Sequence, residues 1–574
     1  MQHMAMSEDE KACREKILSE DYLDLIFEYR TEVEEGGEKS SGYCVEIVDD
    51  LYAIAHISAE DLPPYSVSAY GFRTIPSLFS LQDTGSMAVS GILRAQNQPL
   101  PDLRGQGILI GFIDTGIDYT HQAFRDPDGN TRILSIWDQT IQSENPPEGL
   151  LYGTEYTGEQ INEALRTADP FALVPTRDED GHGTFTAGIA AGSETADGSF
   201  IGAAPEAYLA VVKLKTAKQR LRDYYFLPED TAVYQETDIM MSVRFLLNLQ
   251  RKRRLPMVLC LGLGTNTGGH DGSAPLEEVL TRMTSFRNSI PVVATGNDGN
   301  EAHHYHGRIG AEEEYQDVEI RVPDGSAGFR MEFWGRMLET YSIAVISPSG
   351  ESVPPLPPRN GRSEVFRFVL EPTVVTVDYS LAITRSGSQL ISLGFEKPTA
   401  GIWRLRVFNT ARTRGEYHMW LPIAAQVEEG TEFLRPDPEV TLAIPATSAG
   451  AITTGGYNHR NDSFYIASGR GYTRTGVIKP ALASPCVDVD GPLPGGRYGR
   501  RTGTSVAAAH LAGAVADLLG WGLVQDNARG MDSNVARAYL IRGARRLDGV
   551  FYPNPETGYG LLDLYGIFQK LISY

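Results

Sequence analysis

Cysteine is scarce in this sequence. Only four occur in 574 residues, Cys13, Cys44, Cys260 and Cys486, and no two of them form a CxxC pair. Such wide spacing is typical neither of a disulfide framework nor of a zinc site built from cysteines. The simplest expectation is that all four are reduced thiols.

Long apolar runs are also missing from the printed sequence. The first residues, MQHMAMSEDEKACREK, are polar where a secretory signal would need an apolar core. We find no run of about 18 apolar residues further along the chain. We therefore expect cytoplasmic synthesis without a classical signal peptide, and no membrane partner.

Positive charge is in deficit. The formal net charge of -23 at pH 7 repels nucleic acid, so we expect no nucleic-acid partner, and we interpret the basic run at 251–254 as the solvated end of a helix. Hydrophobic residues at 41% and charged residues at 22% are ordinary values that predict a globular chain. Its length favours about two to four domains.

Alternating strand-like and helical stretches begin near Ile108. The apolar runs ILIGFID, LAVVKL, PMVLCLGLG and PVVATGN are each followed by turns. This pattern predicts an α/β fold with a doubly wound parallel sheet, whose sites gather at the carboxyl ends of the strands. Alternating β segments replace it at residues 301–437, which predicts an inserted all-β sandwich or jelly roll. The alternation of strand-like and helical stretches returns at 438–574.

The N-terminal residues form a separate small unit. A helical pattern runs from Glu8 to about Tyr29, and two β-rich runs follow, from Tyr43 and from Leu51. We predict an α+β domain within residues 1–82.

Three short motifs carry residues suited to nucleophilic catalysis. A buried strand delivers Asp114 at its carboxyl end in ILIGFIDTGID, His182 begins a helix in EDGHGTFTAG, and Ser505 opens a helix in RTGTSVAAAH. A serine nucleophile needs a base, a buried carboxylate that orients the base, and donors for the oxyanion. Asn297, after the strand PVVATGN, offers a side-chain amide beside the backbone N–H of Ser505.

DTG around Asp114, GHGTxxAG around His182 and GTSxAxxHxAG around Ser505, in this order, resemble the three signatures of subtilases. The resemblance implies a subtilisin-like fold and a serine endopeptidase acting on a protein or peptide substrate. Ser505 would be the nucleophile, His182 would be the general base, and Asp114 would orient His182. Asn297 would complete the oxyanion hole beside Ser505. The resemblance also implies a strand that pairs with the substrate backbone, formed by Gly262, Leu263 and Gly264. It further implies a first pocket for a substrate side chain, lined by Val293, Ala294, Thr295 and Gly296.

A second DTG, beginning at Asp83, raises the alternative of an aspartic protease. The two aspartates lie too close in the chain to come from equivalent positions of two lobes, and no apolar strand precedes Asp83. We interpret Asp83 as a turn residue.

Neither a cofactor nor a metal is expected. Where many secreted subtilases carry a calcium-ligating aspartate, this chain has Ala123. No carboxylate or cysteine pattern accompanies His303, His304 and His306 in the sequence, so we interpret these histidines as structural, and His510 likewise.

The N-terminal segment resembles a subtilase propeptide, which templates folding and then occupies the active-site cleft until it is autocleaved. FRTIPSLFSLQD, at 72–83, is similar to the strand and tail that such propeptides lay into the cleft, which implies cleavage near residues 81–83.

The whole arrangement resembles the Csp-type germination subtilases of clostridia, a resemblance carried by ILSEDYLD, IWDQT, GLGTNTGGHDG and GTSVAAAH. It implies activation of the precursor of a spore cortex-lytic enzyme, and association with spores. The implied domains are a ferredoxin-like propeptide at residues 1–82 and a catalytic domain in two parts, at 83–300 and 438–574. A jelly-roll domain at 301–437 would be inserted between these two parts.

Two other functions stay open at this point. This family includes pseudoproteases, so the chain could be a catalytically silent sensor or scaffold whose propeptide blocks the cleft permanently. The retained triad residues argue against that alternative. The β insertion could also bind carbohydrate, although no function follows from a sandwich fold alone.

Overall fold

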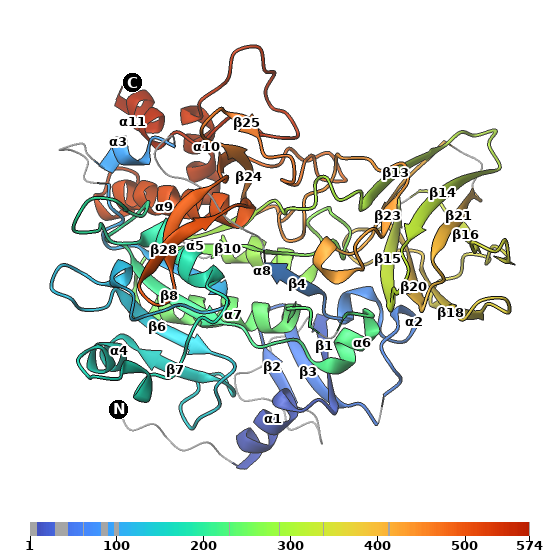
Figure 1. Ribbon diagram of the computed structural model, residues 1–574, viewed down its shortest axis with the longest axis horizontal. Helices are drawn as coiled ribbons and strands as arrows, with labels where there is room; N and C mark the ends of the chain where they lie inside the picture. Colours follow the sequence, from blue (N-terminus) through green and yellow to red (C-terminus); the bar gives the residue numbers. More distant parts are fainter. Residues whose placement is uncertain are drawn as a thin grey trace.

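The computed structural model describes residues 8–28, 44–60, 62–81, 90–96, 103–228, 230–285, 288–336, 338–410 and 414–572. Figure 1 shows three parts: an N-terminal domain in blue, a catalytic domain that contains the C-terminal helices, and a β-rich inserted domain at the far end of the long axis. The chain leaves the catalytic domain for the inserted domain and then returns to it.

A mixed sheet of nine strands forms the centre of the catalytic domain, in the order β25-β24-β12-β10-β5-β8-β6-β7, with β26 beside β24. The pairs from β26 to β6 are all parallel, whereas the edge strands β7 and β25 are antiparallel. The predicted parallel sheet is confirmed. Its strands are β5 (Leu109–Asp114), β6 (Ile133–Asp138), β7 (Thr154–Thr157), β8 (Tyr208–Lys213), β10 (Met257–Leu261), β12 (Ser289–Ala294), β24 (Ile452–Asn458), β25 (Ser463–Phe464) and β26 (Leu482–Pro485).

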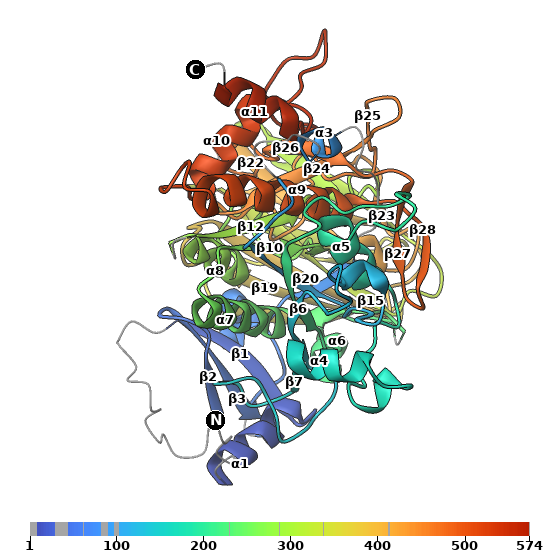
Figure 2. The same ribbon diagram turned by 90° about the vertical axis from the view of Figure 1, so that its left-hand side faces the viewer.

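Helices cover both faces of this sheet, as Figure 2 shows. One hydrophobic core contains α5 and α9, and the other contains α7 and α8. The helices of this domain are α3 (Ile92–Gln96), α4 (Gly158–Leu165), α5 (His182–Ala191), α6 (Gln219–Tyr224), α7 (Glu236–Arg253), α8 (Pro275–Met283), α9 (Thr504–Leu519), α10 (Ser533–Gly543) and α11 (Leu564–Ile572).

Helix α9 is long and apolar because it lies in the interior of the protein. Within the described residues, its continuation Thr504–Val524 is the one helical stretch that meets the length and hydropathy of a membrane span, which the sequence analysis had not found. The structure buries 89% of its most apolar window in the protein. A Cβ on Gly513 would lie 2.3 Å from the Cβ of Ala203, so small residues are what allow this helix to pack so closely.

The N-terminal domain is a three-stranded antiparallel sheet in the order β1-β3-β2, packed against one helix. The predicted helix from Glu8 to Tyr29 is wrong in its second half. Residues YLDLIFE pair along their whole length with β3, so tertiary pairing overrides the helical pattern. The elements are α1 (Glu8–Leu18), β1 (Tyr22–Glu28), β2 (Cys44–Ile47) and β3 (Tyr52–Ser58).

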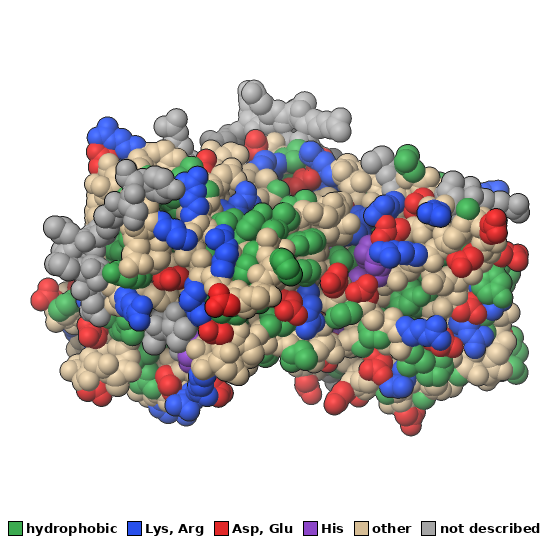
Figure 3. Space-filling view, turned by 90° about the horizontal axis from the view of Figure 1, so that it is seen from above, with side chains coloured by type: hydrophobic (Ala, Val, Ile, Leu, Met, Phe, Trp, Pro, Cys, Tyr) green, Lys and Arg blue, Asp and Glu red, His purple; other side chains and the backbone are tan. Residues whose placement is uncertain are grey.

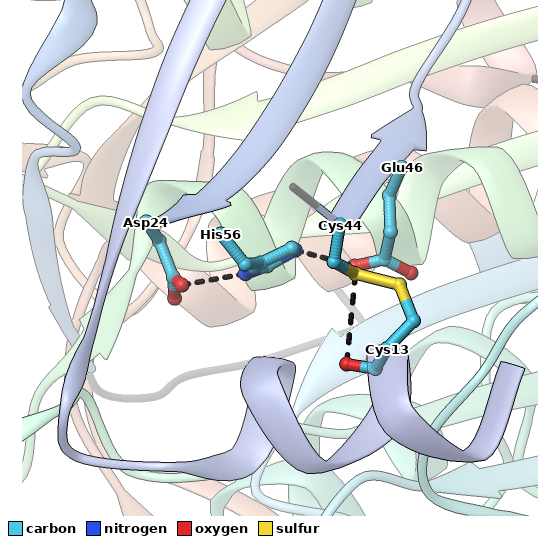
Figure 4. The surroundings of a disulfide bond; sticks show 5 residues. All are labelled: Cys13, Asp24, Cys44, Glu46 and His56. Atoms are coloured by element: carbon cyan, nitrogen blue, oxygen red, sulfur yellow. Dashed lines mark hydrogen bonds and ion pairs between the residues drawn. A yellow bond between two sulfur atoms is a disulfide. The ribbon is translucent and has the colours of Figure 1, made fainter. Parts of the chain in front are cut away.

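The expectation of four reduced thiols is also wrong. Cys13 on α1 and Cys44 on β2 form a disulfide, with their Cα atoms 5.1 Å apart (Figure 4). Spacing along the chain could not show this, because the pair depends on the packing of α1 beside β2. Cys260 and Cys486 are free and buried.

The inserted domain consists of two antiparallel sheets that enclose one hydrophobic core, which confirms an inserted all-β domain. Their orders are β13-β22-β15-β20-β19-β18 and β17-β16-β21-β14-β23. The strands are β13 (His304–Ile309), β14 (Tyr315–Val322), β15 (Gly328–Gly335), β16 (Tyr341–Ile346), β17 (Ser352–Val353), β18 (Arg362–Arg367), β19 (Val374–Ser380), β20 (Gln389–Glu396), β21 (Gly401–Asn409), β22 (Gly415–Trp420) and β23 (Glu432–Phe433).

All three parts meet in one small hydrophobic cluster. Leu78 of the N-terminal segment, Tyr225 of the catalytic domain and Trp420 of the inserted domain are among its buried members. Beside the cluster, Arg73 forms ion pairs with Glu28 and with Glu278 on α8, at 3.1 and 3.2 Å. The inserted domain therefore helps to hold the N-terminal segment on the catalytic domain.

A buried charged cluster joins the N-terminal and catalytic domains. His56 contacts Asp24 at 2.6 Å and Glu46 at 3.1 Å, and Lys218 of the catalytic domain contacts Asp24 at 2.6 Å (Figure 4 shows the first two contacts). Burial would lower the pKa of His56, but the charge of Asp24 and hydrogen bonds to both carboxylates outweigh it and raise the pKa to about 9. His56 is therefore a buried cation at neutral pH.

We predict that this cluster makes stability fall as pH rises above neutrality. Because the pKa of His56 is raised from 6.5 to about 9, its contribution is complete below pH 6.5 and is lost as pH passes 9. The loss amounts to about 3 kcal/mol. Asp24, whose pKa is held well below its usual range, is ionised throughout this window.

Urea unfolding of the full chain at pH 6, 7.5 and 9.5, beside a His56→Gln variant, measures this effect. The variant should show a much smaller decline across the window. Equal declines in both proteins would show that His56 is not responsible.

Candidate active site

The structure brings Asp114, His182 and Ser505 into one hydrogen-bonded chain. His182 donates from Nδ1 to Asp114 Oδ1 at 2.7 Å, and the Ser505 hydroxyl lies 3.0 Å from His182 Nε2. All three side chains are buried. This arrangement holds the imidazole in the tautomer that can accept a proton from the serine.

The carboxyl end of β5 positions Asp114. Its Oδ1 accepts the backbone N–H of Thr115 at 2.7 Å, and its Oδ2 faces the hydroxyl of Thr186 on α5 at 3.3 Å. A buried carboxylate is costly unless it accepts hydrogen bonds, and these donors satisfy it in a fixed orientation.

Asp178 is a positioning residue that the sequence analysis missed. One of its carboxylate oxygens accepts from the hydroxyl of Thr115 at 2.8 Å and the N–H of Gly181 at 2.9 Å. The other accepts from the N–H and hydroxyl of Thr184 at 2.8 and 2.6 Å. Asp178 thus ties the start of α5, where His182 lies, to the residue that follows Asp114. The signal available in the sequence was an acidic residue just before GHGT, where acidic side chains stabilise a helix start.

Gly262 leaves the space in which the serine and histidine meet. A Cβ at this position would lie 2.7 Å from Ser505 Cβ and 3.5 Å from His182 Cε1. The predicted substrate-pairing strand therefore begins directly against the nucleophile, and a side chain there would displace it.

Asn297 lies beside the start of α9. Its Oδ1 accepts the backbone N–H of Thr504 at 2.9 Å, which leaves the amide nitrogen as the donor of this side chain. Asn297 is thereby held next to Ser505.

Residues 105–347 and 392–560 of this chain match the Subtilase family. The chain belongs to this family. Together with the geometry of the triad, family membership assigns the chain to the serine endopeptidases of subtilase type.

Solved and curated proteins agree with this assignment. The structure of the Clostridium perfringens CspB protease is 32% identical, with a TM-score of 0.74, over 84% of this chain and 96% of that one. Two Arabidopsis thaliana proteins, the subtilisin-like proteases SBT2.2 and SBT2.1, are 36% and 34% identical over 131 and 132 residues. Each of these matches spans 19% of this chain and only 15% of the plant protein.

The predicted substrate-pairing strand of this subtilase is occupied by its own N-terminal segment. Strand β11 (Leu263–Gly264) pairs antiparallel with β4 (Leu78–Leu81), so that Leu263 lies opposite Leu81 and Gly264 opposite Ser80. On its other side β4 pairs antiparallel with β9 (Tyr234–Gln235). The predicted cleavage region continues past Leu81 into residues 82 and 83, which lie outside the described residues, as does the second DTG at 83–85.

The residues predicted to line the first pocket divide into two groups. The side chains of Val293 and Ala294 pack in the two hydrophobic cores, so this end of β12 offers only its backbone to a pocket. Thr295 and Gly296 follow the strand, and the N–H of Gly296 donates to the hydroxyl of Thr504 at 3.2 Å. The neighbouring Asp298 accepts the backbone N–H of Ala424 of the inserted domain at 2.9 Å, which ties this carboxylate to that domain.

Nothing in the sequence indicated a metal site, but the structure brings possible metal ligands together. Among the described residues, one group of histidine and acidic side chains has ligand atoms close enough together to hold a metal ion: His306, Glu416 and His418. It lies in the inserted domain, and carboxylates do accompany the histidines in space. His510 is buried in α9, where its Nδ1 donates to the carbonyl of Val506 at 2.9 Å.

We predict that Gly262→Ala, in the chain freed of its N-terminal segment, lowers kcat for peptide hydrolysis by about 100-fold, because its methyl group displaces Ser505 from His182 and misplacement by about 1 Å has that effect. Gly530→Ala, at a position with no atom within 4 Å of the added Cβ, is the matched control. Wild-type kinetics in Gly262→Ala would contradict the close contact.

We further predict that Asp178→Ala lowers the free energy of unfolding by about 2 kcal/mol or more, since buried donors lose their acceptor. Because the variant misplaces His182 and leaves the substrate strand in place, kcat should fall while KM changes little in the chain freed of its N-terminal segment. Thermal unfolding and steady-state kinetics, with the exposed Asp128→Ala as control, measure both effects. An unchanged kcat would show that Asp178 does not position His182.

Proposed function

We propose that this chain is an active endopeptidase of limited specificity that first cleaves its own N-terminal segment. The observation that carries the proposal is the place of β4, whose backbone lies between β11 and β9 beside the Asp114–His182–Ser505 chain. An extended peptide bound through main-chain hydrogen bonds to two flanking strands is the way a protease cleft holds a substrate.

The chemistry follows from the triad. Ser505 attacks the carbonyl of the scissile bond, and His182 takes the hydroxyl proton and later returns it to the leaving amine. Asp114 stabilises the imidazolium that forms in between. The amide nitrogen of Asn297 and the N–H of Ser505 stabilise the oxyanion, and the dipole of α9 adds to this because Ser505 lies in its first turn.

The N-terminal domain acts as a propeptide that blocks the cleft until cleavage. Its support is the register of β4, whose last residue Leu81 lies opposite Leu263, next to the Gly262 that contacts Ser505, and the burial of Ser505. We place the cut near residues 81–83, at the end of β4.

The cleaved propeptide stays bound. The Asp24–Lys218 contact is buried, Arg73 pairs with Glu278 of the catalytic domain, and Gln426 of the inserted domain donates to the carbonyl of Leu78 at 3.2 Å. None of these contacts depends on the peptide bond that is cut. Activity toward other proteins then requires that the segment be displaced from the cleft.

For the physiological substrate, we propose the precursor of a spore cortex-lytic enzyme, and hence association with spores. The support is the resemblance to Csp-type germination subtilases and the likeness to the Clostridium perfringens CspB protease. Incubation of such a precursor with the wild-type chain should give one defined cut, and the same mixture with Ser505→Ala should give none.

We predict that Ser505→Ala abolishes processing. Intact mass of the purified wild type should show two fragments divided near residues 81–83, and they should elute together in gel filtration. The variant should stay whole, and Ser463→Ala, at an exposed serine far from the triad in sequence, should process like wild type.

Processing of Ser505→Ala at the wild-type rate would contradict the nucleophile assignment. If all three proteins stay whole and none cuts the precursor, the chain is a silent subtilase-fold sensor or scaffold and the proposed function is wrong.

A further inference from the structure

A group of histidines on one face of the inserted domain has no part in the mechanism described above. Strands β13 and β22 pair antiparallel with His306 directly opposite His418. Because side chains alternate along a strand, His304, two residues before His306, and Glu416, two residues before His418, point to the same face. The rings of His306 and His418 are stacked, with centroids 4.4 Å apart.

The ligand atoms of His306, Glu416 and His418 already lie within 4.8 Å of one another. His306 Nε2 and Glu416 Oε1 are 2.7 Å apart. Two imidazoles and one carboxylate from rigid strands form a donor set typical of zinc and related divalent transition metals.

A hydrogen-bonded relay orients His418. His304 Nδ1 lies 3.0 Å from the backbone carbonyl of Asp437, which can only accept, so this nitrogen carries the hydrogen. In the neutral ring, His304 Nε2 is then an acceptor, and His418 Nδ1 donates to it at 3.0 Å. The remaining nitrogen of His418, Nε2, is left with its lone pair free to bind a metal.

A second contact orients His306. Its Nδ1 faces the side-chain carboxylate of Asp437 at 3.3 Å, and its Nε2 donates to Glu416 at 2.7 Å. A bound ion would therefore replace the proton on Nε2. A ligating histidine usually donates its other nitrogen to a carboxylate, a carbonyl or water in this way. His306 has such a partner in Asp437, whereas His418 donates to the ring nitrogen of His304.

Two arginines compete with a metal ion for Glu416. Arg336 pairs with Oε2 of Glu416, and Arg308 lies 3.7 Å from Oε1. Both arginine side chains are more than half exposed, so they can turn into solvent when an ion arrives. Figure 3 shows histidine atoms at the surface with acidic and basic side chains beside them. In the proposed site His306 and Glu416 are partly exposed and His418 is buried, so solvent reaches only its edge.

We infer that His306, His418 and Glu416 form a binding site for one divalent zinc-like ion, with His304 and Asp437 as orienting residues. The ion takes the position between His306 Nε2 and Glu416, and water fills the open coordination. Since Asp437 lies where the chain returns to the catalytic domain, a bound ion fixes this junction of the inserted domain. The inference does not depend on protease activity.

Titration of the chelator-treated full-length Ser505→Ala protein tests the site without interference from self-cleavage. Zinc should bind one per chain in competition with a chromophoric chelator, and Co²⁺ in its place should give the visible absorption of a low-coordinate nitrogen and oxygen site. In this background, Asp437→Asn should weaken zinc binding about 10- to 100-fold, and His306→Ala and Glu416→Gln each by more than that.

His459→Ala, which removes a histidine outside the group, should bind zinc like the parent protein and is the matched control. Thermal unfolding of each variant shows that it is folded. Absence of zinc binding by the parent protein, or equal affinity in folded His306→Ala and Glu416→Gln, would overturn the inference.

Discussion

The hydrogen bond from His182 to Asp114 is the interaction on which the catalytic domain depends. Its two residues are 68 positions apart and come from a buried strand and from the first residue of a helix. The bond can form only if α5 begins at one fixed place relative to β5, and Asp178 secures that place through the Thr115 hydroxyl and the N-terminal amides of α5. Ser505 joins them because α9 packs closely, through its small residues, against α5 and the sheet.

The same assembly explains why the N-terminal domain is held so firmly. Its strand β4 fills the groove between β11 and β9, and the ion pairs and the hydrophobic cluster around it come from both other parts of the molecule. The inserted domain reaches β4 directly through Gln426. An insertion far in sequence from the N-terminus thus contacts the strand that pairs with β11.

Local patterns in the sequence were sufficient to predict the sheet and the inserted all-β domain, and they singled out the three residues that the structure joins in one hydrogen-bonded chain. Buried parallel strands read as apolar runs, and the triad residues sit in short motifs at strand and helix ends. What could not be predicted depends on contacts between distant segments. Cys13 meets Cys44 only because α1 packs beside β2, and His306 meets His418 only through the register of β13 with β22.

The same cause explains why Asp178 was missed, and why Gly262, expected in the substrate-pairing strand, was not expected to contact Ser505. Asp178 acts through bonds to Thr115 and Thr184, and the importance of Gly262 comes from the serine, 243 residues away in the chain, that packs against it. The second half of the predicted first helix became β1 because its partner strand β3 offered pairing along its full length.

The central claim is that Ser505 is a nucleophile activated by His182. Reaction of the chain with a small fluorophosphonate, followed by peptide mapping, tests it most directly. We predict a single adduct on Ser505 in the wild-type chain, formed faster once the N-terminal segment is dissociated, and no adduct in His182→Ala. A folded wild-type chain freed of that segment and still unlabelled at Ser505 would contradict the account.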